Sequence, residues 1–452
     1  MKRREAFLGL ARFLLHLANF TGRLQNMIVS ISLSARTGIL VVAFALAAIL
    51  SWLSMRAALA AHYAGLGTLD GYTKATQLEP SNAKNWDLLG RYWLENLEQP
   101  DVRRTIESYR ISLSLDSLSV TPWLDLASAY EIEGDVAAAR TAYLQAKHVY
   151  PGSADAAWRY GNFLLRQGES AAGLLEIHRA VETEPGRGLE AFLSCRHVEP
   201  NVDLLLDRVL APVASIYVEV LWRLTDEGDT HGGLKVWSKL IALRPKLTQR
   251  EVFFFVDGLL HERQVVEALR VWREATPLMD LPKLEDPPSS LIWDGGFETD
   301  ITGGGLAWRV EPYRPIKISY DSKIRHSGKR ALRVDISKND NSDFVGVCQR
   351  VVLEPNTTYE FSAWLRTRDL AKDGGILFRL THPGDPAGQD IATSKLAGTN
   401  EWTKVSVHWN SPDHLQVSQV CLSRASDLES SQLPGVAWVD DVSLLKLGAF
   451  VN

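Results

Sequence analysis

A set of small and aromatic residues recurs in this chain at intervals of 34 residues, and this period limits the possible fold more than any other feature. The matched pairs are Ala127 with Gly161, Gly134 with Gly168, Ala146 with Ala180, and Pro151 with Pro185. Small side chains let two antiparallel helices cross closely, and a proline ends the second helix. The period therefore predicts a stack of five to six helix pairs between about residues 62 and 278, with an irregular joint over 186–212.

The best-preserved unit resembles a tetratricopeptide repeat. The matching positions are Trp123, Leu126, Ala127, Tyr130, Gly134, Ala139, Tyr143, Ala146 and Pro151. Upstream, Tyr72, Ala75 and Pro80 fit the second helix of a truncated first unit. The resemblance implies an all-α tetratricopeptide repeat solenoid over 57–280 that docks protein partners in a groove.

The groove candidates are the inner positions of the first helix of each unit. By spacing they are Lys84, Asp87, Arg91, Leu124, Ser128, Glu131, Trp158, Asn162 and Leu165. In the subgroup that grips a C-terminal carboxylate these positions hold Lys and Asn; here Asn162 fits, whereas Asp87 and Leu124 depart from the pattern. The alternative is an ordinary solvated or packed helix face, since few residues dominate an interface.

A stretch of 19 residues without a charge, 37–55, precedes the repeats. About 20 apolar residues in a helix span the hydrocarbon core of a bilayer, so we expect a transmembrane helix over 37–56. The segment 1–36 has six Lys and Arg residues against one acid, Glu5, whereas the segment after the stretch is nearly uncharged. The positive-inside rule then predicts a cytoplasmic N-terminal segment and a periplasmic or extracytoplasmic location for the rest, as in a single-pass bacterial inner-membrane protein.

Other interpretations of the N-terminal region remain open. Ala58-Leu59-Ala60 resembles the cleavage site of a secretory signal peptide, although the charged leader is long for one. A buried core helix is the third interpretation, and the absence of charge argues against it. Residues 5–20 fit an interfacial helix.

Beyond a proline-containing linker at 281–290, the hydrophobic period changes from helical to alternating. One row of apolar residues consists of Phe361, Ala363 and Leu365, and the residues between them are polar or larger. The same alternation occurs in residues 376–381 and 404–409. Turn-forming segments such as Asp373-Gly374-Gly375 separate these runs. The pattern predicts an antiparallel β-sandwich over 291–452.

The order of short motifs in this region resembles the jelly-roll carbohydrate-binding modules appended to cellulases and xylanases. The motifs are IWDGGFE at 292–298, HSGKRALRV at 326–334, VCQRVVLEPNTTYEFSAWLR at 347–366, EWTKVSVHW at 401–409 and AWVDDVSLLKL at 437–447. The resemblance implies a structural calcium ion held by Glu298 and Asp440, whose carboxylate oxygens suit that cation. The alternative is that both carboxylates accept hydrogen bonds from nearby backbone amides.

Sugar binding on such a fold needs aromatic faces and a few polar groups. If Phe361, Ala363 and Leu365 face the core, the other face holds the glycan-binding candidates Trp364, Arg366, Arg379 and Gln419. Tyr313 and Tyr320 form a second candidate platform. A loop or the repeat domain could instead cover this face and leave Trp364 in the core. Cys348 and Cys421 have the same outward parity and pair if their strands are neighbours.

No pattern in the sequence predicts a catalytic site. His261-Glu262 lacks the second His of an HExxH zinc site, and Gly303-Gly304-Gly305 lacks the strand and helix of a phosphate loop. The 49 Lys and Arg against 54 Asp and Glu leave a formal charge of −5, which gives no sign of a nucleic-acid partner. Apart from the calcium ion, we expect no cofactor.

These features together predict a membrane-anchored extracytoplasmic scaffold. Its repeats would bind envelope or polysaccharide-assembly proteins and its β domain a polysaccharide, in exopolysaccharide or cell-envelope assembly. The alternative is a purely structural protein–protein adaptor whose β domain binds no sugar. A third class, a hydrolase, would require turnover, and we expect none.

Overall fold

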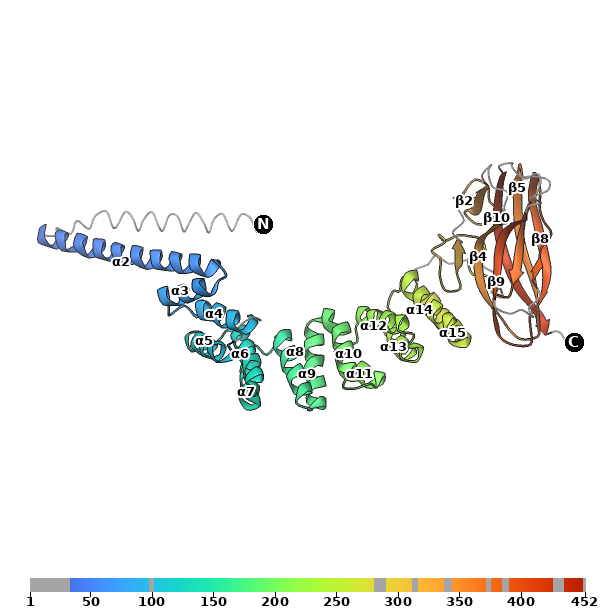
Figure 1. Ribbon diagram of the computed structural model, residues 1–452. Helices are drawn as coiled ribbons and strands as arrows, with labels where there is room; N and C mark the ends of the chain where they lie inside the picture. The colour runs from blue at the N-terminus through green and yellow to red at the C-terminus, as the bar shows by residue number, and fades with distance from the viewer. Residues whose placement is uncertain are drawn as a thin grey trace, which may run out of the picture. The chain divides into compact units, whose positions relative to one another are not determined.

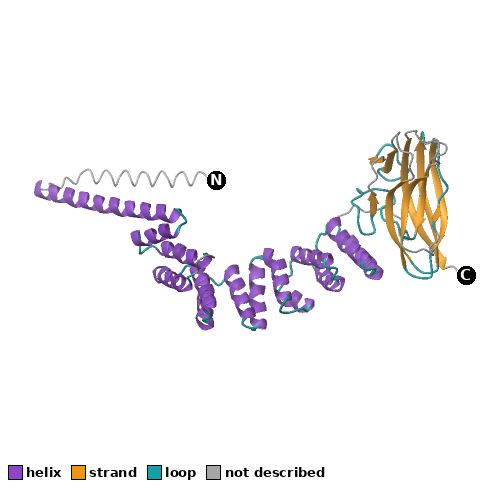
Figure 2. Cartoon of the chain, viewed as in Figure 1, coloured by secondary structure: helices purple, strands orange, loops and turns teal. Residues whose placement is uncertain are grey.

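The computed structural model describes residues 33–96, 101–279, 290–310, 316–336, 344–370, 375–383, 390–425 and 435–449. Helices make up the first part of the chain and strands the second, as Figures 1 and 2 show. The chain divides into two compact units between Arg159 and Tyr160. The predicted fold class, a helical repeat solenoid followed by a β-sandwich, is confirmed.

The helices of the described residues follow one another in short antiparallel pairs. They are α2 (Leu33–Gly65), α3 (Leu69–Leu78), α4 (Ala83–Glu95), α5 (Val102–Leu115), α6 (Val120–Glu133), α7 (Val136–Val149), α8 (Ala154–Arg166), α9 (Ser170–Thr183), α10 (Gly188–Arg196), α11 (Val202–Arg208), α12 (Ala214–Asp226), α13 (Thr230–Ala242), α14 (Gln249–His261) and α15 (Val265–Ala275). Single 3₁₀ turns, η1 (Pro185–Arg187) and η2 (Thr276–Leu278), follow α9 and α15.

Small residues at the inner positions of the repeat pattern let the helices of a pair touch. A Cβ at Gly90 would lie 3.2 Å from the ring of Tyr109, and one at Gly161 would lie 2.9 Å from the side chain of Ile177. Gly134 ends α6 with a left-handed backbone, φ 87°, which favours glycine. The period therefore has a direct steric cause.

The irregular joint is itself a helix pair. Residues 186–212 were expected to fit no unit, but α10 and α11 form there, with 9 and 7 residues. Both contact α9, and they also contact α12 and α13 respectively, so the stack continues through the joint. The short helices lack the length of a full repeat, which is why the spacing did not reveal them.

The apolar N-terminal helix is longer than predicted. It spans 33 residues, Leu33–Gly65, instead of 37–56, and in the described part of the chain it is the one helix long and apolar enough to cross a membrane. Its last turns pack on α3: Ala60 is fully buried, and Arg56 donates a hydrogen bond to the carbonyl oxygen of Leu78. The first repeat is thus not truncated, because the end of α2 serves as its first helix.

Two antiparallel five-stranded sheets form the C-terminal sandwich. One, the β4 sheet, has the order β1 (Trp308–Val310), β4 (Phe344–Leu353), β9 (Gln416–Ala425), β6 (Gly375–Thr381), β7 (Ile391–Ala392). The other, the β5 sheet, has the order β2 (Ile316–Asp321), β3 (Ala331–Ile336), β10 (Gly435–Ala449), β5 (Thr357–Arg368), β8 (Asn400–Asn410).

The core lies between these sheets. Phe361 of β5 and Phe378 of β6 contact each other, with ring centroids 4.9 Å apart, and Ala363 and Leu365 are fully buried beside them. The predicted inward parity of β5 is therefore confirmed. Most of the predicted linker, 281–290, lies outside the described residues.

Candidate functional site

The predicted glycan-binding residues do not share a face. Trp364 and Arg366 lie on β5, whereas Arg379 and Gln419 lie on β6 and β9 of the opposite sheet. Each pair points away from the common core, so the two pairs lie on opposite outer surfaces of the sandwich. The prediction of one shared surface is wrong, because strand parity tells inward from outward but not which sheet a strand joins.

Trp364 is half-buried beneath another ring. The imidazole of His326 stacks on it with centroids 3.9 Å apart and an interplanar angle of 18°, and Trp402 meets His326 edge-on at 5.6 Å. The imidazole thus covers one face of the indole, where a sugar ring would stack. Arg366 forms an ion pair with Glu401 at 2.9 Å on the same surface.

Tyr320 of the second candidate platform is held by two neighbouring groups. The guanidinium of Arg330 lies 3.7 Å from the ring centroid of Tyr320, and the Tyr320 hydroxyl accepts a 2.6 Å hydrogen bond from the amide of Ile301. Tyr320 therefore packs as a structural residue. Tyr313 lies outside the described residues.

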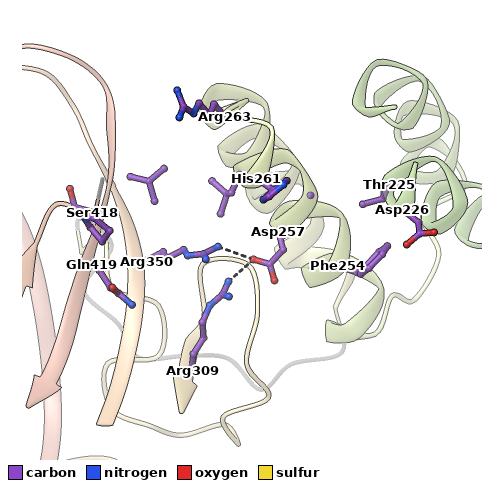
Figure 3. A pocket seen from close by; sticks show the side chains of 14 residues that line it. Thr225, Asp226, Phe254, Asp257, His261, Arg263, Arg309, Arg350, Ser418 and Gln419 are labelled. Carbon is purple, nitrogen blue, oxygen red and sulfur yellow. Dashed lines mark hydrogen bonds and ion pairs between the residues drawn. The ribbon is translucent and has the colours of Figure 1, made fainter. Parts of the chain in front are cut away.

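The outer surface of the β4 sheet opens onto a cleft that helix α14 closes on the other side (Figure 3). Its volume is about 780 Å³. The lining residues are Thr225, Asp226, Phe254, Asp257, Gly258, Leu260, His261, Arg263, Arg309, Arg350, Pro383, Val417, Ser418 and Gln419. Of the sequence-predicted candidates, Gln419 alone lines this cleft.

A glycine-rich loop holds α14 and α15 near the sandwich. A Cβ at Gly304 would lie 2.6 Å from Cβ of Phe253, and one at Gly305 would lie 2.8 Å from the ring of Trp272. Trp272 in turn meets Trp293 edge-on at 5.7 Å. Close packing against these two aromatic side chains therefore explains Gly304 and Gly305, whereas Gly303 has a left-handed backbone, φ 72°, with open space where a Cβ would lie.

One carboxylate joins the two sides of the cleft. Oδ1 of Asp257 on α14 accepts a 2.5 Å hydrogen bond from Nη2 of Arg309 and a 3.3 Å bond from Nη1 of Arg350 (Figure 3). Arg309 also donates to the carbonyl oxygen of Gly305 at 2.8 Å. Two guanidinium groups thus share one carboxylate oxygen.

Sequence reasoning missed Asp257, Arg309 and Arg350. Arg350 has the outward parity of Cys348, so the alternation within β4 was enough to place it on the same surface as Gln419. Nothing in the local sequence marks Asp257, which lies on a helix like many other surface acids. Only the contact between α14 and the sheet brings it to the two arginines.

The predicted disulfide lies on this outer surface. Cys348 of β4 and Cys421 of β9 face each other directly in the strand register and form the bond. The pairing prediction is confirmed. Cys195 is buried and unpaired, and burial raises the pKa of its thiol to about 11.

The geometry around Glu298 and Asp440 tests whether a calcium ion would fit. A Cβ at Gly296 would lie 3.7 Å from Cγ of Glu298 and 3.8 Å from Oδ1 of Asp440, so both carboxyl groups flank this glycine. Asp440 is fully buried and accepts backbone hydrogen bonds from His326 and Ser327 at 2.8 and 3.1 Å, and Glu298 accepts one from Lys329 at 2.7 Å.

These carboxylates have the hard oxygens that calcium prefers. Burial raises the pKa of Asp440 to about 6, and the neighbouring carboxylate of Asp441 adds to the rise. In the described part of the chain no group of three or more His, Cys, Asp and Glu side chains gathers, so a calcium ion here would take its other ligands from backbone carbonyls and water. A calcium ion at this position stays a prediction, and the backbone hydrogen bonds to both carboxylates match the alternative.

The inner face of the first repeats forms a polar network. Asp87 pairs with Lys84 at 2.6 Å, and Asp125 pairs with Arg159 at 2.8 Å and lies 3.7 Å from Arg91. Both aspartates are buried, with 4% and 6% of their surface exposed. Charged residues thus alternate in sign along α4, α6 and α8.

The other groove candidates divide into packed and half-buried residues. Leu124 is 1% exposed, so it belongs to the helix core and the groove prediction is wrong for it. Ser128 and Glu131 hydrogen-bond with Tyr143 at 3.4 and 2.6 Å. Trp158, Asn162 and Leu165 are half-buried on α8.

Residues 289–423 match the family model of a carbohydrate binding domain. The tRNA(Glu)-specific nuclease WapA of Bacillus subtilis subsp. natto (strain BEST195) is 31% identical over 164 residues, 35% of this chain and 7% of that protein. The tRNA nuclease WapA of Bacillus subtilis (strain 168) is 30% identical over the same lengths. The chain thus spans 7% of the length of these relatives, so the nuclease names refer to proteins far longer than the shared segment.

Solved structures with similar parts belong to two groups. A family 16 carbohydrate binding module is similar to 34% of this chain and 99% of its own, with 24% identity and a TM-score of 0.26. The MamA protein is similar to 52% of this chain and 98% of its own, with 14% identity and a TM-score of 0.27. YrrB, a TPR protein with an unusual peptide-binding site, is similar to 47% of this chain and 93% of its own, with 15% identity and a TM-score of 0.25.

Proposed function

We propose that this protein is a membrane-anchored extracytoplasmic scaffold that binds glycan through its β-sandwich and protein partners through its repeats, in exopolysaccharide or cell-envelope assembly. The match of residues 289–423 to a carbohydrate binding domain carries the proposal. The cleft over the β4 sheet supplies a site of about 780 Å³, large enough for a few sugar units. We propose a binding protein and no catalytic activity.

Two observations support the extracytoplasmic location. The 33-residue helix α2 follows a basic leader, which favours transfer of the following chain across the membrane. The Cys348–Cys421 disulfide favours an oxidising compartment such as the periplasm, because cytosolic thiols are kept reduced. The charge bias and the disulfide both favour the far side of the membrane for the chain after α2.

The repeats are the proposed docking surface for envelope or polysaccharide-assembly proteins. Their inner face carries alternating charges held in place by ion pairs, such as Arg159 with Asp125 at 2.8 Å. Ordered charges of both signs suit a polar partner segment, because complementary charges select a partner and its register. No described feature of the repeats favours nucleic acid.

The glycan proposal is tested by affinity electrophoresis of the full-length protein in detergent against neutral and acidic polysaccharides. We expect retardation by at least one polysaccharide. Val417→Trp, which places a large ring at the cleft wall, is expected to abolish it. Trp364→Ala on the opposite sheet serves as the control and is expected to leave retardation unchanged. No retardation by any polysaccharide would contradict the glycan-binding role.

A specific observation favours the alternative, a protein–protein adaptor with a sandwich that binds no sugar. His326 covers one face of Trp364, and helix α14 stands over the β4 sheet. If the adaptor is correct, the full-length protein retains its protein partners in a pull-down while every polysaccharide fails to retard it. Loss of those partners on charge reversal at Arg91 would then map them to the repeats.

A further inference from the structure

The cleft between α14 and the β4 sheet is dominated by guanidinium groups. Its lining includes Arg263, Arg309 and Arg350 against Asp226 and Asp257, which gives three positive and two negative charges. The cleft therefore has a formal charge of +1 in a chain whose formal charge is −5.

The excess positive charge is concentrated around one carboxylate. Arg309 and Arg350 both donate hydrogen bonds to Oδ1 of Asp257 (Figure 3). The three side chains are 21%, 38% and 33% exposed respectively, so a ligand in the cleft can reach them. Arg263 is exposed at the end of α14, and in the described part of the chain no ion pair holds its guanidinium.

The sheet side of the cleft offers no aromatic platform among its described residues. The side chains there are Arg309, Arg350, Pro383, Val417, Ser418 and Gln419, and Phe254 comes from the helix side. Neutral sugars are commonly held by stacking on aromatic rings. Guanidinium groups instead form paired hydrogen bonds with carboxylates, so this lining suits an anionic ligand better than a neutral one.

We propose that the cleft binds an acidic polysaccharide through the carboxylates of its uronic acid units. Arg350 and Arg263 pair with those carboxylates, and Asp257 acts as an internal carboxylate that competes with the ligand for Arg309 and Arg350. This inference rests on the proposed glycan-binding function and adds to it the class of sugar. It also makes α14 part of the binding site, so the last repeat and the sandwich bind the ligand together.

The test measures binding of the full-length protein in detergent to polygalacturonate, alginate and hyaluronan, each paired with its methyl-esterified form. Esterification removes the negative charge and keeps the sugar backbone. We expect at least one acid form to bind about tenfold or more tightly than its ester, since hydrogen bonds to charged groups are the stronger ones. Arg350→Gln with Arg263→Gln is expected to remove that preference.

Two further variants keep the test informative if the double variant folds poorly. Asp257→Asn removes the internal competitor and is expected to tighten binding of the acid form several-fold, an effect opposite to simple damage. Arg366→Gln removes the same charge on the other sheet, where Arg366 pairs with Glu401, and is expected to change nothing. Circular dichroism checks the fold of each variant.

The possible outcomes distinguish failure of the acidic-polysaccharide proposal from failure of the proposed glycan-binding function. Equal binding of acid and ester forms overturns the acidic class and leaves the glycan function standing. If Arg366→Gln abolishes binding while the double variant Arg350→Gln with Arg263→Gln keeps it, the binding site lies on the β5 sheet. That result also overturns the inference. Displacement of the polysaccharide by poly-glutamate at equal carboxylate concentration overturns a sugar ligand in favour of an acidic peptide. No binding of any polysaccharide overturns both.

Discussion

At the scale of single residues, Asp125 is the central carboxylate of the polar network in the first repeats. It is 6% exposed, accepts a hydrogen bond from Tyr109 at 3.2 Å and pairs with Arg159 at 2.8 Å. Asp125→Asn removes the charge that both groups face. We expect the free energy of unfolding to fall by about 1–3 kcal/mol, the cost of leaving a buried polar group poorly paired.

Urea denaturation followed by tryptophan fluorescence measures this loss. Asp70→Asn is the matched control, because Asp70 is exposed and pairs with Lys74 one helical turn away, at 2.6 Å. Solvent screens such an exposed pair, so we expect a much smaller loss of stability in this variant. Equal effects of the two variants would contradict the role given to Asp125.

Glu298 and Asp440 are the second residue-scale prediction, since both fit a calcium ion in chemistry. A bound ion stabilises the folded state by about 2.7 kcal/mol at a hundredfold excess over its dissociation constant. We expect calcium to raise the melting temperature, EGTA to reverse the rise, and Glu298→Gln to weaken it. Calorimetric scans with magnesium in place of calcium provide the control. Identical scans with calcium and with EGTA would show that backbone amides alone satisfy the two carboxylates.

At the scale of elements, the end of α2 serves as the first helix of the first repeat. A Cβ at Gly71 of α3 would overlap the carbonyl oxygen of Tyr63 in α2, so the two helices touch backbone to backbone there. Gly71→Ala is expected to push α3 away and to cost about 1–3 kcal/mol, as overpacking does. Hydrogen exchange of 66–80 measures the loosening.

Gly65→Ala is the matched control for that variant, because a Cβ at Gly65 meets nothing within 4 Å. It is expected to leave exchange unchanged. Unaltered exchange in Gly71→Ala would mean that α2 and α3 do not form a repeat.

The disulfide is the second element-scale feature, since it ties β4 to β9 across 73 residues of chain. A bond that closes such a loop restricts the unfolded chain, and its removal from a domain costs about 2–5 kcal/mol. Replacement of both Cys348 and Cys421 by Ala is therefore expected to lower the unfolding midpoint in guanidinium. Dithiothreitol should lower the midpoint of the wild-type protein and leave that of the variant unchanged. If dithiothreitol lowered the unfolding midpoint of both proteins, the reduction of this disulfide would not be the cause.

At the scale of the whole molecule, the prediction is that α2 crosses a membrane and carries the rest of the chain to the far side. A C-terminal alkaline phosphatase fusion, which is active only outside the cytosol, is expected to be active. The matching green fluorescent protein fusion is expected to be dark when exported through the same route. Bright fluorescence with an inactive phosphatase would reverse the sidedness and remove the proposed extracytoplasmic role.

Most elements and their order along the chain could be predicted from local patterns. Periods of 34, about 3.6 and 2 residues are local properties, so they predicted the helix pairs and the inward parity of β5 without knowledge of the fold. The same parity placed Cys348 and Cys421 on the outer surface, and the disulfide followed once β4 and β9 were neighbours. Short helices such as α10, with 9 residues, contain too little of any period to be found this way.

The residues that line the cleft could be identified only once the chain was folded. Parity could not assign Trp364 and Gln419 to different sheets, because strand order depends on pairing between distant segments. The ion pairs of Asp257 with Arg309 and Arg350 join residues 52 and 93 positions apart, on elements of different type. Local sequence patterns cannot predict such a contact, because the contact arises when a helix packs against a sheet.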